Sequence, residues 1–406
     1  MPQDLIVRNA KLRDGSQVDI AVSDGKYAEI TPKISDSSSQ EIDAGGNLVT
    51  ESFVVAQLHL DKVYTVDWLE EAAAGYFDEG MGGAMTTIER AAEVKRHYEE
   101  DEALERMNRA LTKAALAGAT HIRAFIDIDS KAELKGMKAA LRAKEQWRDR
   151  IDLQLVAFAQ DGLLREPGAE ELMWEGMELG ADVVGGIPWI EFTEADMRRH
   201  TDITFEMATK YDKDLTSLVD DAGDPDLRTS EYLAVSSIKH GWQGRVVASQ
   251  ARASAIYNEV YHLKWVELLR QGGVGIVTNP HSGPLHVRVQ ELAKAGITLA
   301  LGGESIHDAY YPFGRCNMLE AAFVCTHTLW SMEPDDQELL YDMITVNAAK
   351  LMRLPTHQIA VGNAANLVIL QDDSVREALT HHREPRYVIF EGRVTAESTS
   401  SSNLVD

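Results

Sequence analysis

The sequence predicts an α/β protein: a (β/α)8 barrel, or TIM barrel, with a small β-sandwich domain built from both termini. First, strand-like and helix-like segments alternate between residues 49 and 355. Second, many of the strand-like runs are continuously apolar, which is typical of parallel strands covered by helices. Third, both ends of the chain carry short strand-like runs, too few at either end to close a core.

The barrel elements are expected in a regular order. Strands are expected at Phe53–Ala56, His121–Ile128, Leu153–Ala159, Val183–Ile187, Leu215–Val219, Arg245–Ser249, Gly275–Asn279 and Thr298–Gly302. Helices are expected between them at Asp101–Leu116, Lys131–Glu145, Ala169–Leu179, Glu194–Lys210, Asp226–Lys239, Tyr257–Gln271 and Val287–Lys294. A doubly wound open sheet is the alternative, but no G-x-G-x-x-G follows the first strand and no P-loop motif occurs.

Both ends of the chain supply the predicted β-sandwich. Two Asp-Gly pairs mark hairpin turns among the alternating runs of the first 48 residues. Further strand-like runs occur at Leu367–Leu370 and Tyr387–Val394. We therefore expect residues 1–48 and 356–398 to form the small domain, residues 49–355 the barrel, and residues 399–406 a flexible tail.

Charge and hydropathy restrict the classes of partner. The 406 residues carry a formal net charge of -25, whereas nucleic acids and anionic membranes attract basic surfaces. We therefore expect no nucleic-acid partner and no membrane partner. No run of about 18 apolar residues occurs, and the N-terminus lacks the basic and apolar regions of a signal peptide.

The chain has only two cysteines, Cys316 and Cys325. Nine residues apart on an expected helix, they would lie on opposite sides of it, because nine steps of about 100° come to roughly 900°. We therefore expect no disulfide between them, and we expect a cytoplasmic location, where thiols stay reduced.

The stretch Phe53–Lys62 carries the most informative polar residues. A buried strand is expected to run into a tip made of Gln57, His59, Asp61 and Lys62. Because side chains alternate along a strand, Gln57 and His59 should project to the same side. A His-x-His pair in this place commonly holds a metal ion at the mouth of a barrel, but here the first position is glutamine.

Polar residues also follow the other expected strands, and the C-terminal ends of barrel strands converge on one pocket. In strand order they are Asp127 and Asp129, Gln160 and Asp161, Trp189 and Glu191, Asp220 and Asp221, Gln250 and Arg252, Asn279 and His281, and Glu304, Ser305, His307 and Asp308. So many buried polar groups exceed what a core needs, since each must find a partner. Single residues have ordinary explanations too: Asp220 or Asp221 would also cap the next helix, and Trp189 or Tyr310 would also pack in the core.

Several stretches carry a resemblance to one known family: Gln57–Lys62, His121–Asp127, Ile151–Gln160, Gly180–Pro188, Val246–Ser249, Tyr310–Gly314 with Asn317–Leu319, and Gly362–Leu370. In these stretches the sequence resembles the amidohydrolase superfamily, specifically its cytosine deaminase branch, which includes N-isopropylammelide amidohydrolase-like enzymes. The resemblance covers nearly the whole chain. It implies a (β/α)8 barrel and a hydrolase that acts on C–N bonds other than peptide bonds.

The resemblance also implies a metal site, from which this chain departs. Relatives hold one divalent metal with His-x-His after strand 1, a His after strand 5 and an Asp after strand 8, with another His after strand 6 nearby, and a Glu after strand 5 shuttles protons. In this chain Gln57 and His59 stand at the His-x-His positions, Leu218 at the strand-5 His and Glu304 at the strand-8 Asp. Gln250 stands at the strand-6 His and Asp221 at the proton-shuttle Glu. Only His59 and Glu304 are good ligands, where a tightly bound zinc takes three or four. We expect no metal held in the family's way and no other cofactor, while a weakly bound divalent metal stays open.

We therefore expect a metal-independent hydrolase of a C–N bond in a small, cyclic nitrogenous compound. Asp221 or Glu304 is the expected general base, and His59 or Lys62 is expected to polarise the substrate. Substrate contacts are expected from Gln57, Gln160, Trp189, Gln250, Ser305, Tyr310 and His281. By the resemblance, Gln160 would hydrogen-bond the amide edge of a substrate ring.

Three alternative functions stay open at this point. The chain could be a pseudoenzyme that binds a ligand or partner without chemistry, a metal-free lyase or isomerase, or a metal-dependent deaminase with an altered site. The expected partner is a small-molecule substrate, and a homo-oligomer is compatible with the sequence.

Overall fold

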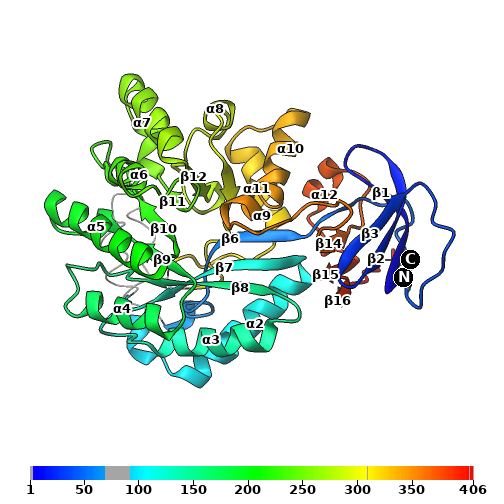
Figure 1. The fold of residues 1–406 in the computed structure, drawn as a ribbon, viewed down its shortest axis with the longest axis horizontal. Coiled ribbons are helices and arrows are strands. Elements are labelled where there is room, and N and C mark those ends of the chain that lie inside the picture. Colours follow the sequence, from blue (N-terminus) through cyan, green and yellow to red (C-terminus); the bar gives the residue numbers. More distant parts are fainter. Residues whose placement is uncertain (1–2, 69–91, 309, 402, 406) are drawn as a thin grey trace.

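The computed structural model describes residues 3–68, 92–308, 310–401 and 403–405. Figure 1 shows two units, a barrel surrounded by helices on the left and a β-domain on the right that contains elements from both termini. In the described part of the chain, no helix is long and apolar enough to cross a membrane.

The barrel sheet consists of eight strands paired in chain order, every pair parallel. They are β6 Phe53–His59, β7 Ala119–Asp127, β8 Asp152–Phe158, β9 Val183–Gly186, β10 Asp214–Val219, β11 Val246–Gln250, β12 Val274–Thr278 and β13 Leu299–Leu301. Leu58 of β6 forms a parallel bridge with Glu304, and the His59 N–H donates to the Glu304 carbonyl at 2.8 Å. These contacts close the sheet into a barrel.

Helices follow the strands and cover the outside of the sheet (Figure 1). They are α2 Glu100–Leu116, α3 Lys135–Trp147, α4 Ala169–Leu179, α5 Glu194–Tyr211, α6 Thr229–His240, α7 Glu259–Gly272 and α8 Val289–Lys294, then α9 Met318–Thr328, α10 Pro334–Asp342 and α11 Val346–Leu351 after β13. Ala348 and Ala349 of α11, with Met352, pack against Val54 and Ala56 inside the barrel. Apolar packing therefore fills the barrel at the N-terminal ends of its strands, and the C-terminal ends carry the polar groups.

The β-domain consists of two four-stranded sheets, with strand orders β3-β2-β1-β4 and β16-β15-β14-β5. The strands are β1 Leu5–Lys11, β2 Gln17–Ser23, β3 Lys26–Thr31, β4 Glu41–Asp43, β5 Val49–Glu51, β14 Leu367–Ile369, β15 Tyr387–Phe390 and β16 Arg393–Glu397, with α12 Val375–His381 between β14 and β15. Apolar side chains of both sheets form one core cluster. β5 pairs antiparallel with β14, so strands from the two ends of the chain share a sheet.

The predicted fold class is confirmed, because a barrel of eight parallel strands and a separate β-sheet domain from both termini are both present. Each expected barrel strand overlaps an observed one. The exact domain limits stay a prediction, as does the flexible tail. β5 begins directly after the expected boundary at residue 48 and yet pairs with the terminal sheet.

Two expected helix positions are corrected by local capping. α3 begins at Lys135 rather than Lys131, because Asp129 accepts backbone hydrogen bonds from the residues at 131 and 132 and holds that segment as a turn. Cys316 lies before α9, not on the same helix as Cys325, because the Asn317 side chain caps that helix. Both thiols are free and buried.

Candidate active site

Three side-chain amides converge on one carboxylate at the C-terminal ends of the strands. Gln57 of β6 donates to Glu304 Oε2 at 3.0 Å, and Gln250 of β11 donates to the same oxygen at 2.7 Å. Asn279, directly after β12, also donates its Nδ2 hydrogen to that oxygen, while its Oδ1 accepts from the Gly302 N–H at 2.9 Å. We call this group, Gln57, Gln250 and Asn279 around Glu304, the amide cage.

The environment of Glu304 places its titration near neutral pH. Burial raises the pKa of this carboxyl to about 7; Arg252 opposes the rise, and the neighbouring charges of Asp221 and Asp308 add to it. The hydrogen bond from Gln250 also favours the charged form. Glu304 can therefore exist in both protonation states near pH 7, which suits a group that accepts and later returns a proton.

Asp221 lies near this cage but is bound to a cation. Arg252 Nε donates to Asp221 Oδ1 at 2.7 Å, and the same guanidinium donates to Ser282 Oγ at 2.9 Å and to the Leu285 carbonyl at 3.0 Å. Burial raises the pKa of Asp221, although Arg252 opposes that rise. This aspartate is thus held by a fixed guanidinium, whereas Glu304 is held by neutral amides.

His59 lies on the apolar side of the barrel mouth. Its ring centre is 5.4 Å from that of Phe125 and 5.7 Å from that of Phe158. Trp189 and Leu218 belong to the same apolar cluster as these two phenylalanines, with Tyr310 packed against it. Burial, then Lys62 and Lys95, lower the pKa of His59 well below its ordinary value. The imidazole is therefore neutral at physiological pH, and no described residue bonds its Nδ1.

Gln57 and His59, expected to project together, contact different groups. The register of β6 against β7 shifts between Val55 and Leu58, so the regular alternation of the strand is interrupted there. Gln57 bonds Glu304 after β13, whereas the His59 ring contacts aromatic rings of β7 and β8.

Lys62 is buried and bonded to two of the residues that the sequence places at strand ends. Its Nζ lies 2.5 Å from Asp127 Oδ1 and donates to Gln160 Oε1 at 3.4 Å. The same nitrogen is 5.1 Å from the centre of the Tyr310 ring. Because Lys62 engages the oxygen of the Gln160 amide, the nitrogen of that amide is the end left for a ligand.

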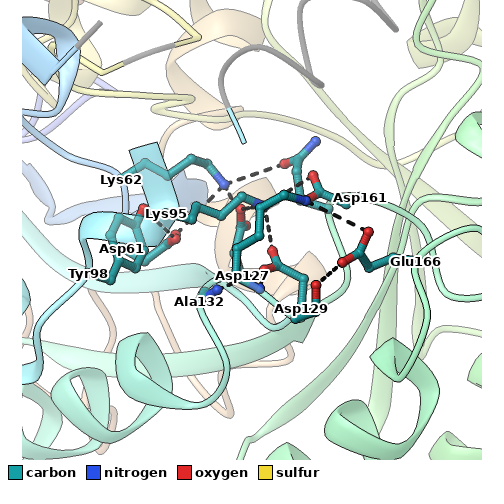
Figure 2. Close-up of polar contacts among 12 residues, drawn as sticks. Asp61, Lys62, Lys95, Tyr98, Asp127, Asp129, Ala132, Asp161 and Glu166 are labelled. Carbon is teal, nitrogen blue, oxygen red and sulfur yellow. Dashed lines mark hydrogen bonds and ion pairs between the residues drawn. The ribbon is translucent and has the colours of Figure 1, made fainter. Parts of the chain in front are cut away.

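A second buried lysine, Lys95, joins the strand ends of β7 and β8 and was missed by sequence reasoning. Figure 2 shows its side chain among the carboxylates of Asp127, Asp129 and Asp161. The distances from Nζ are 3.0, 2.5 and 3.1 Å in that order. Burial acts to lower the pKa of Lys95, but the three carboxylates outweigh it and raise that pKa well above its ordinary value.

Asp61 and Tyr98 complete this network on the β6 side. The Tyr98 hydroxyl donates to Asp61 Oδ2 at 3.1 Å (Figure 2). Burial and the neighbouring charge of Asp127 raise the pKa of Asp61 to about 7, against the effect of Lys62. Lys95 and Tyr98 come from the segment around the short 3-10 helix Glu93–His97, which carried no strand-end signal in the sequence.

The loop after β13 places the remaining predicted residues. Ser305 is buried, and Asp308 accepts the backbone N–H groups of Tyr310 and Tyr311. Burial raises the pKa of Asp308 to about 6, opposed by the Ser305 hydroxyl and these amides. His281 lines a cavity of about 130 Å³ together with Gly303, Tyr311 and Cys316. Burial lowers the pKa of His281 to about 4.

Two strand-end carboxylates have structural partners. Asp220 accepts hydrogen bonds from the backbone and hydroxyl groups of Thr229 and Ser230, so it holds the N-terminus of α6, the capping role considered for this aspartate. Glu191 accepts three backbone N–H groups of residues 163–165 and bonds His200 Nδ1 at 2.7 Å. These bonds shape the loops around the site.

Comparison with known proteins shows the family of this chain. The amidohydrolase family matches residues 40–396 of the chain. The chain belongs to the amidohydrolase family. This membership supports the expected enzyme class, a hydrolase acting on C–N bonds other than peptide bonds.

Individual relatives cover nearly the whole of this amidohydrolase. The N-isopropylammelide isopropyl amidohydrolase of Pseudomonas sp. (strain ADP) is 32% identical over 397 residues, 96% of each chain. The pterin deaminase of Rhizobium rhizogenes is 24% identical, covering 96% of this chain and 90% of the relative. The crystal structure of 5-methylcytosine deaminase from Klebsiella pneumoniae liganded with 5-fluorocytosine superposes with a TM-score of 0.91 at 28% identity, over 98% of this chain and 99% of that one.

The divalent metal implied by the resemblance does not fit the donor groups present. Gln57 and Gln250 direct their NH2 groups at Glu304, and Leu218 has no donor atom. His59 packs against two phenylalanine rings. Among residues 3–68, 92–308, 310–401 and 403–405, no group of three or more His, Cys, Asp or Glu side chains could hold a metal ion.

Proposed function

We propose that this amidohydrolase hydrolyses a C–N bond of a small, cyclic nitrogenous compound without a metal ion, with Glu304 as the general base. The observation that carries the proposal is the amide cage, in which three N–H donors meet one oxygen of Glu304. Three residues of the cage, Gln57, Gln250 and Glu304, stand where the resemblance implies a metal site. Neutral donors fix the position of the carboxylate, and its pKa of about 7 suits proton transfer near neutral pH.

Glu304 is a better candidate for the base than Asp221. A carboxylate beside a guanidinium is stabilised in its charged form and is correspondingly weaker as a base. Arg252 is 2.7 Å from Asp221, whereas the donors to Glu304 are uncharged. In addition, no described residue donates to Glu304 Oε1, which leaves that oxygen for a water molecule. We assign Asp221 a supporting electrostatic role.

The proposed reaction balances with Glu304 as the carrier of a single proton. Water attacks the ring carbon, a C–O bond forms, and Glu304 takes the proton that the water loses. Negative charge develops on a ring nitrogen or carbonyl oxygen of the substrate. The C–N bond then breaks, and Glu304 returns the proton to the leaving nitrogen. The products are the oxo compound and ammonia or an amine, and no oxidant or reductant is required.

Lys62 is the proposed group that stabilises the developing negative charge. It is held at 2.5 Å by Asp127 and faces the ring of Tyr310, so its position is defined before a ligand binds. The neutral imidazole of His59 is less suited to that task than a cation. The apolar cluster that contains Trp189 would contact the faces of a planar ring, and Gln160 would donate to an acceptor on its edge.

The relatives support the substrate class. The names of three similar proteins refer to N-isopropylammelide, pterin and 5-methylcytosine, which are all cyclic nitrogenous compounds. We extend that class to this chain and leave the individual compound to experiment. The cytoplasmic location and a homo-oligomer stay predictions.

Activity and metal content should be measured on the same purified protein. The assay follows release of ammonia or amine from amino- and alkylamino-triazines, pterins and aminopyrimidines, with and without a chelator. We expect turnover that survives chelation and well under one equivalent of bound metal. Glu304→Gln should lower kcat by about 10²–10⁴-fold, the usual range for losing a general base. Glu267→Gln, on the exposed face of α7, is the matched control and should leave kcat unchanged.

Other outcomes distinguish the alternatives. Stoichiometric zinc or iron, with activity lost on chelation, would establish a metal-dependent deaminase instead. Product formed in ¹⁸O-labelled water without incorporation of the label would indicate a lyase or isomerase. Ligand binding without turnover of any compound in the panel would indicate a binding protein.

A further inference from the structure

The amide cage contains two buried acceptor atoms that no described residue engages. The side chains of Gln57 and Gln250 are both fully buried, and each donates its amide nitrogen to Glu304. The oxygens of the same amides, Gln57 Oε1 and Gln250 Oε1, have no hydrogen-bond partner in the described part of the chain. A buried amide oxygen without a partner is costly, so such atoms indicate a place for a hydrogen-bond donor.

The orientation of both amides follows from Glu304. An ionised carboxylate only accepts hydrogen bonds, so each amide must present its NH2 group to Glu304 and turn its oxygen away. Within an amide, the oxygen and nitrogen are about 2.2 Å apart, as the bond lengths require. Because the two nitrogens lie 3.0 and 2.7 Å from Glu304 Oε2, both free oxygens lie within about 5 Å of that carboxylate oxygen.

This spacing fits a small tetrahedral donor. Around one nitrogen with hydrogen bonds of about 2.9 Å, neighbouring acceptors are roughly 4.7 Å apart. By the limits above, each amide oxygen lies close enough to the Glu304 carboxylate for one nitrogen to bond both. A donor with several N–H groups could therefore bond the carboxylate together with an amide oxygen that has no other partner.

The charges around the cage favour a cation. The charges of Asp221 and Asp308 both act on Glu304, so negative charge gathers around the cage. The nearest guanidinium, Arg252, already bonds Asp221, Ser282 and the backbone at Leu285. A positively charged donor in the cage would gain from the carboxylate, and charge-assisted hydrogen bonds are the stronger ones.

We propose that Gln57 Oε1, Gln250 Oε1 and Glu304 form a binding site for ammonium or a small primary alkylammonium. Its identification with the nitrogen product of the reaction rests on the proposed function, while binding itself does not. The leaving nitrogen would then depart into a site that holds it as a cation, and ammonium would inhibit the enzyme as a product.

Direct binding of ammonium chloride to the wild-type protein tests the site. Isothermal titration at pH 8 and constant ionic strength is expected to give saturable binding of ammonium and of methylammonium, with sodium and potassium chlorides at least tenfold weaker. The proposal would be overturned if potassium bound as tightly as ammonium. It would also be overturned if ammonium did not bind at concentrations from 100-fold that of the protein up to the high millimolar range.

Variants locate the site within the barrel. Gln57→Leu and Gln250→Leu should each weaken ammonium binding about tenfold, since each removes one acceptor of a charge-assisted hydrogen bond. Gln271→Leu, at the exposed end of α7, is the matched control and should bind as the wild type does. If a leucine variant fails to fold, as judged by circular dichroism, Gln57→Met and Gln250→Met replace it. Unchanged binding in folded variants at both positions refutes the site.

Kinetics separate this inference from the proposed function. If the protein hydrolyses a substrate and ammonium binds, added ammonium should inhibit, and Gln57→Leu should relieve that inhibition. Hydrolysis without any ammonium binding would reject the site and leave the function intact. Ammonium binding in a protein that hydrolyses nothing would reject the function and leave the site intact.

Discussion

Replacing Lys95 by methionine tests the buried ion network beside the site. The substitution keeps the length of the side chain and removes the charge that lies within 3.1 Å of three buried carboxylates. Removing one partner of a buried ion pair costs about 3–5 kcal/mol. Asp127 and Asp161 retain Lys62 and Lys131, so we expect a loss near the lower end, about 3 kcal/mol.

Urea denaturation of the wild type and Lys95→Met gives the change in the free energy of unfolding. Lys239→Met, on the exposed last turn of α6, is the matched control and should change that free energy by less than about 0.5 kcal/mol. A loss below about 1 kcal/mol for Lys95→Met would refute the argument, because the network would then contribute little beyond an exposed ion pair.

The pH dependence of the loss provides a second check. Without Lys95, the pKa of the buried carboxyl of Asp129 should rise in the folded state, because burial remains and the cation is gone. A group whose folded-state pKa is raised above the unfolded value destabilises the fold as pH rises through it. Lys95→Met should therefore lose more stability at pH 8 than at pH 5, and an equal loss at both would contradict this reasoning.

Three further outcomes follow from the site and the fold. Plotted against pH, kcat/KM should rise through about 7, because the pKa of Glu304 is about 7 and only its ionised form accepts a proton; Glu304→Gln should lack this rise. Gly302→Ala should move the midpoint of this kcat/KM profile to higher pH, because the new Cβ would lie 2.6 Å from Asn279 Oδ1 and displace Asn279, a donor to the Glu304 carboxylate. An unchanged midpoint in the folded variant would argue against the cage. Burial lowers the pKa of His121 well below its ordinary value, so the stability that this residue contributes should fall as pH drops below about 6.5. In urea titrations, lowering the pH from 7 to 5 should therefore change the free energy of unfolding less favourably in the wild type than in His121→Gln.

The barrel could be predicted because each of its elements has a local signal. The continuous apolar run that begins at Phe53 and the similar runs after it are what strands buried on both faces require, and helical patterns lie between them. Capping shifted the boundaries, as at the turn held by Asp129 before α3, because one side-chain hydrogen bond decides where a helix begins.

The site was predictable in its location and only partly in its contacts. The strand-end rule brings Gln57, Gln250 and Glu304 to one end of the barrel, and the structure places them in direct contact. It places His281 in a cavity that Gly303, next to Glu304, also lines, and it binds Asp221 to Arg252. The roles assigned to the site residues stay predictions.

The sequence by itself determined the architecture and the family, since both depend on residue identity and order, and at Gln57, Leu218 and Gln250 it departs from the metal ligands that the resemblance implies. Only the tertiary structure decided which groups meet. Lys95 has no sequence motif around it, yet it contacts three aspartates from two strand ends. The pKa of Glu304 depends on burial and on the charges of residues that are distant in sequence. Hydrogen bonds and electrostatic interactions act over a few ångströms in space, and distance along the chain does not reveal them.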